Sequence, residues 1–277
     1  MPPSQAQIAR FHAQGYLAIP HFFSQQEVFA MRGELERLAR DRVFRNVSTA
    51  GDGVTLAESK QNLQICPLHP QSKLFRALQF HPQVLDVVEA LIGGPLVLHL
   101  DQTFLKPART GQGTSWHQDN AYFQIADPFL GCAMWIAVHD ACVENGTMEV
   151  IPGVARRKFE HSRDPMSDHH IRCYPDESKA EPIELDAGGV LFFCYGVPHC
   201  TRENKSNRDR ASVAYHFMNQ ALYTPELLKG NAPVGTYLTG PQSSGGLSEY
   251  GERVAGSWAE LVQGFASVRS ASLTALF

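Results

Sequence analysis

The sequence lacks several features that define common classes of protein. Its six cysteines include no Cys-x-x-Cys pair, which excludes zinc-ribbon and thioredoxin-like sites and predicts reduced, mostly buried thiols. No apolar run approaches the roughly 20 residues of a membrane span, and the most apolar stretch, 189–197, has the length of a buried strand. No glycine-rich phosphate loop is present, so nothing specific indicates a CoA thioester.

The sequence also has no excess of positive charge, with 24 Lys and Arg against 28 Asp and Glu. The net charge of −4 gives no reason to expect a nucleic-acid partner, which usually requires a basic surface. The first residues, Met-Pro-Pro-Ser-Gln, have neither the basic nor the apolar region of a secretory signal. We therefore expect a cytoplasmic protein without membrane or nucleic-acid partners, a monomer or homodimer that acts on a small molecule.

The first third of the chain is predicted to be largely helical. Ser4 and Ser24 precede apolar residues at helical spacing and have the side chain of an N-cap, so helices are expected after each. A short strand, 16–20, lies between them. A third helical region, 70–92, is interrupted near His81-Pro82.

Short strands dominate the middle of the chain. They are predicted at 96–106, 131–140, 147–151, 183–186, 190–195 and 210–219. Glu144-Asn-Gly146 has the composition of a tight turn, which predicts a hairpin between the second and third of these strands. This order favours an α+β protein whose core is a double-stranded β-helix, or jelly roll, with flanking helices.

No linker divides the chain, so a single domain over 1–277 is expected. Its parts are a helical region (1–94), the jelly-roll core (95–220) and a C-terminal extension (221–277) with a closing helix near 249–265. Two irregular segments, 44–64 and 154–180, have the length of lids over a site.

A candidate metal motif lies in the segment 114–123. His117 and Asp119 are two residues apart, and on a strand both side chains would leave the same face. An imidazole and a carboxylate form two corners of the 2-His-1-carboxylate triad that suits Fe(II) and leaves positions open for O₂ and a co-substrate. The third corner requires a distant histidine. His199 follows the most apolar strand and is the best candidate.

A co-substrate carboxylate would need a fixed cation nearby. Arg210 begins the strand after His199, and its planar fork matches a carboxylate. Thr201 offers a hydroxyl to the same group. Arg208 is the alternative anchor.

The chain resembles the phytanoyl-CoA dioxygenase family of non-haem Fe(II)/2-oxoglutarate oxygenases over roughly residues 4–220. The matching segments are Phe-Leu-Lys106-Pro, Trp-His117-Gln-Asp119-Asn-Ala-Tyr-Phe, Met-Trp135-Ile-Ala, Glu-Asn145-Gly-Thr-Met-Glu-Val-Ile-Pro-Gly153, and Pro-His199 with Arg210. The resemblance implies a jelly-roll core with Fe(II) bound by His117, Asp119 and His199.

The same resemblance implies how the co-substrate is held. Arg210 and Thr201 would bind the distal carboxylate of 2-oxoglutarate, Lys106 would approach it, and Trp135 would line its pocket. Gln102 shares a strand face with Lys106 and would touch 2-oxoglutarate or substrate. Three aromatic residues near the motif are candidates for the substrate pocket: Trp116, Tyr122 and Phe123.

The predicted activity is hydroxylation of a C–H bond of a small metabolite, with release of succinate and CO₂. Halogenating relatives carry a small residue in place of the carboxylate ligand, so the presence of Asp119 favours oxygenation. Desaturation, demethylation or ring formation would use the same residues. From a different class, a catalytically silent jelly-roll binding protein that keeps the pocket is the alternative.

Overall fold

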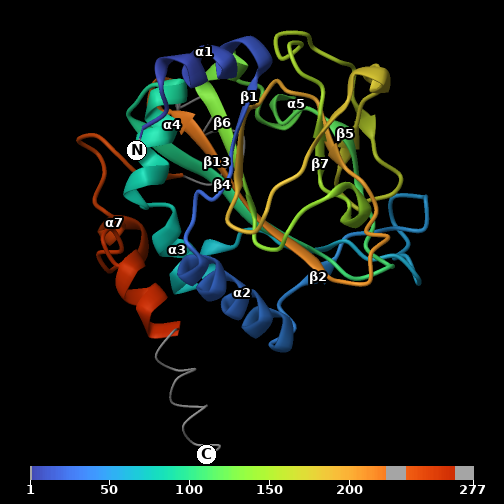
Figure 1. Ribbon diagram of the computed structural model, residues 1–277, viewed down its shortest axis with the longest axis horizontal. Helices are drawn as coiled ribbons and strands as arrows, with labels where there is room; N and C mark the ends of the chain where they lie inside the picture. Colours follow the sequence, from blue (N-terminus) through green and yellow to red (C-terminus); the bar gives the residue numbers. More distant parts are fainter. Residues whose placement is uncertain (1, 223–234, 266–277) are drawn as a thin grey trace, which may run out of the picture.

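The computed structural model describes residues 2–222 and 235–265, which fold around two antiparallel β-sheets (Figure 1). Within these residues the large sheet has the order β1-β11-β6-β13-β4-β3-β2, with β14 also paired to β4. Its strands are β1 (Tyr16–Ile19), β2 (Arg45–Asn46), β3 (Leu63–Ile65), β4 (Leu96–Lys106), β6 (Gly131–Ala137), β11 (Val190–Cys194), β13 (Arg210–Asn219) and β14 (Thr236–Tyr237). The small sheet has the order β10-β7-β12-β5, formed by β5 (Thr114–His117), β7 (Met148–Val150), β10 (Glu181–Ile183) and β12 (His199–Thr201).

The helices cover one side of the large sheet, and the small sheet lies on the other side (Figure 1). They are α1 (Gln5–Gln14), α2 (Gln25–Arg40), α3 (Lys73–Leu78), α4 (Pro82–Ile92) and α7 (Leu247–Tyr250). The short helix α5 (Asn120–Phe123) follows β5 and lies on the side of the small sheet (Figure 1). Ser4 and Ser24 are the N-caps of α1 and α2, as predicted. Each also forms a capping box, in which the serine side chain accepts from the backbone N–H three residues on and the side chain of that residue accepts from the serine N–H. Among the described residues, no helix is long and apolar enough to cross a membrane.

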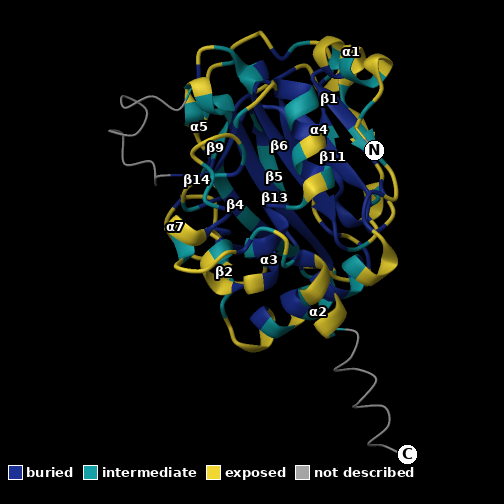
Figure 2. Ribbon diagram, turned by 90° about the vertical axis from the view of Figure 1, so that its left-hand side faces the viewer, coloured by how far each residue is buried: buried dark blue, intermediate teal, exposed yellow. Residues whose placement is uncertain are grey.

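The core lies in the centre of the large sheet. Every residue of β6 and β11 is buried, as expected for strands covered on both faces (Figure 2). β4 and β13 pair over their whole lengths, and their bounds agree with the predicted strands. The predicted jelly-roll fold is confirmed. The large sheet also takes in β1, which is the strand predicted at 16–20, and β2 and β3, which lie within and at the end of the segment 44–64 that was expected to be irregular.

The predicted hairpin around residues 144–146 is wrong. β6 pairs with β11 and β13 in the large sheet, whereas β7 pairs with β10 and β12 in the small one. Asn145 shapes the connection, because its side chain accepts from Cys142 N at 2.9 Å and donates to Asp140 O at 2.7 Å. The left-handed turn at Gly146, φ 73°, then carries the chain from one sheet to the other.

The two segments predicted as lids are bound to each other. The Thr49 side chain donates to Pro165 O at 2.6 Å, and Thr49 N donates to Met166 O at 3.0 Å. Gly53 N and Asp168 N add further hydrogen bonds between the segments. Segment 154–180 also contains a small ribbon of β8 (Ser162–Arg163) and β9 (Ile171–Arg172). The segments thus form one hydrogen-bonded layer.

The predicted closing helix begins later than expected. Residues 247–250 form the single turn α7, and a further helical segment covers 258–265. The Trp258 indole donates to Glu27 at 2.7 Å and so binds this segment to α2. The remainder of the predicted C-terminal extension, 223–234 and 266–277, lies outside the described residues.

Candidate metal centre

A cavity of about 210 Å³ lies between the two sheets. Alternate residues of β4 and of β13 point into it, as the two-residue period of a strand requires. These are Leu100, Gln102, Phe104 and Lys106 on β4, and Arg210, Ser212, Ala214 and His216 on β13. We call the part around His117, Asp119, His199, Lys106 and Arg210 the inner end. The part around Gln64, Tyr122, His169 and His170, where two exposed side chains reach the solvent, is the outer end.

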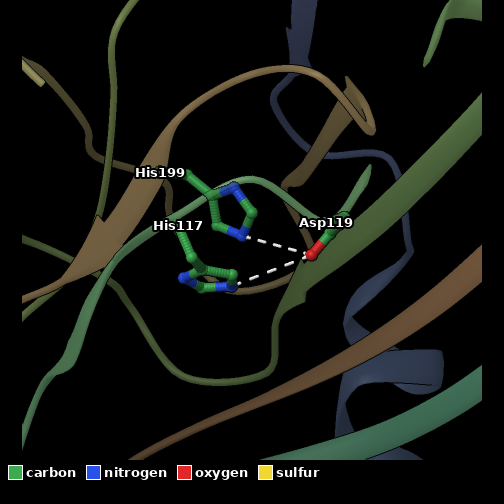
Figure 3. A group of neighbouring side chains, drawn as sticks. All are labelled: His117, Asp119 and His199. Carbon is green, nitrogen blue, oxygen red and sulfur yellow. Dashed lines mark ion pairs between the residues drawn. The ribbon is translucent and has the colours of Figure 1, made fainter. Parts of the chain in front are cut away.

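The structure brings His117, Asp119 and His199 together at the inner end (Figure 3). One ligand atom from each lies within 4.8 Å of the others. Asp119 Oδ1 is 3.7 Å from Nε2 of both histidines. The two histidines are direct cross-strand neighbours on β5 and β12, and this register explains how a residue 82 positions further along the chain meets His117.

Both histidines present the same ring nitrogen to the centre of the cluster. His117 Nδ1 lies 2.8 Å from Ser115 O, and His199 Nδ1 lies 3.0 Å from Val197 O. A carbonyl can only accept, so Nδ1 carries the proton and Nε2 offers its lone pair. Burial lowers the pKa of His117 to about 3 and also lowers that of His199. Both rings are therefore neutral, as metal ligands must be.

Asp119 reaches the cluster by a different route from the one predicted. β5 ends at His117, and Asp119 has helical backbone angles at the start of α5. The turn, and not a shared strand face, directs its carboxylate toward the histidines. Burial would raise the pKa of Asp119, but the imidazoles of His199, His216 and His117 hold it below its usual value. The carboxylate is thus ionised.

His216 is a site residue that the sequence analysis missed. Its Nε2 lies 3.3 Å from Asp119 Oδ2, and the residue is only 3% exposed. It stands six positions after Arg210 on the same face of β13. Following the two-residue period on from Arg210 would have identified it.

Arg210 and Lys106 are neighbours across β13 and β4, and each is 1% exposed. Arg210 donates to Ser212 Oγ at 3.0 Å and to Gly146 O at 2.5 Å, while its Nε is buried without a partner. Lys106 Nζ donates to Arg202 O at 2.6 Å. Burial lowers the pKa of Arg210 to about 10 and that of Lys106 well below its usual value. No carboxylate among the described residues forms an ion pair with either cation.

The other residues expected to hold the co-substrate also line the cavity. Thr201 on β12 accepts from Thr114 N at 3.1 Å, and the Trp135 ring lies 5.6 Å from the Arg210 guanidinium. Gln102 accepts a hydrogen bond from Gln64 at 2.9 Å. The alternative anchor, Arg208, is exposed and is not among the lining residues.

Two of the three aromatic candidates lie at the cavity. Tyr122 and Phe123 line it, and the Tyr122 hydroxyl accepts from Ile171 N at 2.9 Å. Trp116 does not. It points away from its neighbour His117 and packs with Ile151, Cys173 and Cys200 in a separate cluster.

Gln118, between His117 and Asp119, anchors the motif to neighbouring segments through hydrogen bonds. Its amide donates to Gly196 O at 2.6 Å and to Arg157 O at 2.8 Å, and it accepts from Phe159 N at 3.1 Å. Gln118 N donates in turn to His161 Nε2 at 3.0 Å. These contacts bind segment 154–161 to the backbone between His117 and Asp119.

Comparison with known proteins gives the same picture. The family model described as "Phytanoyl-CoA dioxygenase (PhyH)" matches residues 11–212. The chain is 30% identical over 242 residues to L-proline trans-4-hydroxylase of Streptomyces griseoviridis, covering 78% of this chain and 86% of that one. It is 26% identical to ectoine dioxygenase of Stutzerimonas stutzeri, covering 79% and 78%.

Among solved structures, the chain is similar to the epimerase SnoN in complex with Fe³⁺, alpha ketoglutarate and nogalamycin RO. The TM-score is 0.66 at 21% identity, covering 86% of this chain and 96% of that one, which shows a shared fold. The family model spans well over half of the sequence and includes His117, Asp119 and His199. The chain therefore belongs to the phytanoyl-CoA dioxygenase family.

Proposed function

We propose that the protein is an Fe(II)- and 2-oxoglutarate-dependent oxygenase that hydroxylates a C–H bond of a small molecule. Family membership makes it an oxidoreductase of the dioxygenase class. The observation that carries the proposal is the combination of a largely buried His-Asp-His cluster with two buried cations that form no ion pair with a carboxylate among the described residues. The His-Asp-His cluster fits a metal ion, and the two cations fit the 2-oxo acid that would bind beside it.

The donor set suits Fe(II). Two neutral imidazoles and one carboxylate would hold the ion through His117, Asp119 and His199 and leave further positions open, with His117 partly buried and the other two buried. Asp119 Oδ1 faces both histidines, while Oδ2 lies 3.3 Å from His216 Nε2, which orients the carboxylate toward the position of the metal. The intact carboxylate also favours oxygenation over halogenation.

The cation pair suits 2-oxoglutarate. The buried Arg210 has an unpartnered Nε and would bind the distal carboxylate, with Thr201 donating its hydroxyl to the same group. Lys106 would contribute a second positive charge, and the Trp135 ring would form one wall. A buried cation is stabilised when an anion binds, so these residues orient the co-substrate toward the metal.

When bound, Fe(II) and 2-oxoglutarate would supply the oxidation chemistry: the substrate C–H bond, O₂ and 2-oxoglutarate are converted to a C–OH group, succinate and CO₂. The protein's own residues bind and orient the reactants. The buried walls of the cavity exclude water from the inner end, and the layer formed by 44–64 and 154–180 covers the outer end.

A monomer or homodimer that acts on a small molecule is consistent with this arrangement, since all the residues named lie in one chain.

The test is conversion of 2-oxoglutarate to succinate by the native chain with Fe(II) and O₂, measured with and without a metabolite panel. We expect slow Fe(II)-dependent turnover that a true substrate accelerates. A chain that forms no succinate with any compound would instead be the silent binding protein.

A further inference from the structure

His170 is a buried side chain that the proposed reaction leaves without a role. It is 7% exposed, lines the outer end of the cavity, and belongs to segment 154–180. No hydrogen bond of its ring nitrogens is found among the described residues, although its ring packs 4.1 Å from that of His169 and 6.0 Å from that of Phe104. Buried polar side chains usually have a partner. An imidazole without one, facing a cavity, indicates a bound molecule.

The backbone holds His170 in place. Asp164 N donates to His170 O at 2.9 Å, and His170 N donates to Ser167 Oγ at 3.3 Å. The hydrogen bonds that Thr49 donates to Pro165 O and Met166 O fix the segment 164–170 further. The imidazole is therefore positioned without using either ring nitrogen, so both remain available to a ligand.

The ring is also uncharged. Burial lowers the pKa of His170 well below its usual value, and the nearby His169, His117 and Arg45 lower it further. A neutral imidazole has one N–H donor and one acceptor. It therefore suits a hydroxyl, carbonyl or carboxylate oxygen.

The surrounding described lining offers no carboxylate outside the metal cluster to pair with a positive charge. Among the described lining residues, Asp119 is the only acidic side chain, and it belongs to the metal cluster. The other polar side chains at this end are His169, Tyr122 and the amide of Gln64, which donates to Gln102 at 2.9 Å. Leu100 and Phe104 supply the apolar wall. An ammonium group placed here would be desolvated without a counter-ion, which is strongly unfavourable.

We propose that His170 binds an oxygen function of the substrate, and that the site selects small, partly apolar, oxygen-bearing molecules over their ammonium counterparts. The proposal rests on the proposed oxygenase function. It assigns part of the substrate choice to segment 154–180 and gives that segment a specific contact.

The experiment uses matched compounds that share a carbon skeleton: cyclohexanol with cyclohexylamine, hexanoate with hexylamine, and 3-phenylpropanoate with 3-phenylpropylamine. Succinate release is measured for the native chain, His170→Phe, His170→Asp and the control His12→Phe, an exposed histidine of α1 outside the cavity lining. We expect oxygen-bearing members to stimulate release about tenfold more than their amines.

In His170→Phe the KM for a stimulating compound should rise about tenfold, whereas the KM for 2-oxoglutarate changes less than about twofold. His170→Asp should shift the preference toward the amines, because it supplies a counter-ion. Equal stimulation by amines, no stimulation by any oxygen-bearing member, or an equal rise in both KM values would overturn the assignment.

A visible absorption spectrum, recorded anaerobically with Fe(II) and 2-oxoglutarate but no substrate, tests the proposed oxygenase function independently of the substrate assignment. If the metal-to-ligand charge-transfer band is present and the selectivity is absent, the substrate assignment fails alone. If the native chain gives no band, the oxygenase proposal fails and the assignment fails with it.

Discussion

The two ends of the cavity hold their polar groups in different ways. At the inner end, charged and metal-ligating side chains lie on or directly after paired strands: His117 on β5, His199 on β12 and Arg210 on β13. At the outer end, His169 and His170 lie on the irregular segment 154–180, which is hydrogen-bonded to segment 44–64. Strand register positions the residues proposed to bind the metal and 2-oxoglutarate, whereas loop contacts position His170, which is proposed to bind the substrate. The chemistry and the selectivity should therefore respond to different substitutions.

The largest effect should come from the metal cluster. Asp119→Ala removes the only carboxylate among the three candidate ligands, so we expect Fe(II)-dependent succinate formation to fall by about a hundredfold or more. Isothermal titration with Fe(II) under anaerobic conditions measures the accompanying loss of binding. The control is Asp127→Ala, because this carboxylate is partly exposed, lies outside the cavity lining and pairs with Arg156. Native-rate turnover in Asp119→Ala would refute its assignment as a ligand.

Arg210→Gln tests the co-substrate anchor. Loss of a charge-assisted bidentate contact should raise the KM for 2-oxoglutarate by about ten- to a hundredfold while Fe(II) affinity is retained. The exposed Arg208 supplies the matched control, and Arg208→Gln should leave that KM unchanged. If Arg208→Gln has the larger effect, the anchor lies there and the inner end is incorrectly assigned.

His216→Phe probes the contact behind Asp119. The 3.3 Å contact with Asp119 Oδ2 orients the carboxylate that faces the two histidines, so its loss should weaken Fe(II) binding by about tenfold. Partial recovery in His216→Asn would show that a polar contact, and not packing alone, is responsible. Unchanged Fe(II) affinity in a folded His216→Phe would remove His216 from the site.

These positions show how far the sequence defines the inner end. His117, Asp119, His199 and Arg210 were identified because motif spacing and the strand period are local signals. β4 and β13 were predicted to the residue for the same reason. His216 carried the same signal, since it continues the alternation that begins at Arg210. The helical start at Asp119 carried no such signal.

At the outer end the sequence predicts Tyr122 but not His170, and the reason is physical. His170 lies in the cavity because segment 164–168 binds to residues 47–53, more than a hundred positions earlier, and no local pattern encodes that pairing. The incorrect hairpin at 144–146 has a similar cause. A turn motif specifies that the chain reverses, but it does not specify which sheet receives the next strand.

The smallest effect should come from the contact between the two loop segments. Thr49→Val keeps the shape of the side chain and removes the hydrogen bond to Pro165 O, so we expect a loss of about 1 kcal/mol in local stability. Hydrogen exchange should accelerate at Gly53 and Asp168, whose amides bond across the two segments. The KM for 2-oxoglutarate should stay constant, because the inner end does not depend on this contact. A rise in that KM would show that the two ends are coupled.

The central claim is that one cavity binds Fe(II) and 2-oxoglutarate together, and a single anaerobic titration tests it most directly. Fe(II) is added to the native chain, followed by 2-oxoglutarate, and the visible absorption is recorded after each addition. We predict a metal-to-ligand charge-transfer band that appears only when both are present and saturates at one 2-oxoglutarate per chain. The absence of that band at saturating Fe(II) and 2-oxoglutarate would contradict the claim.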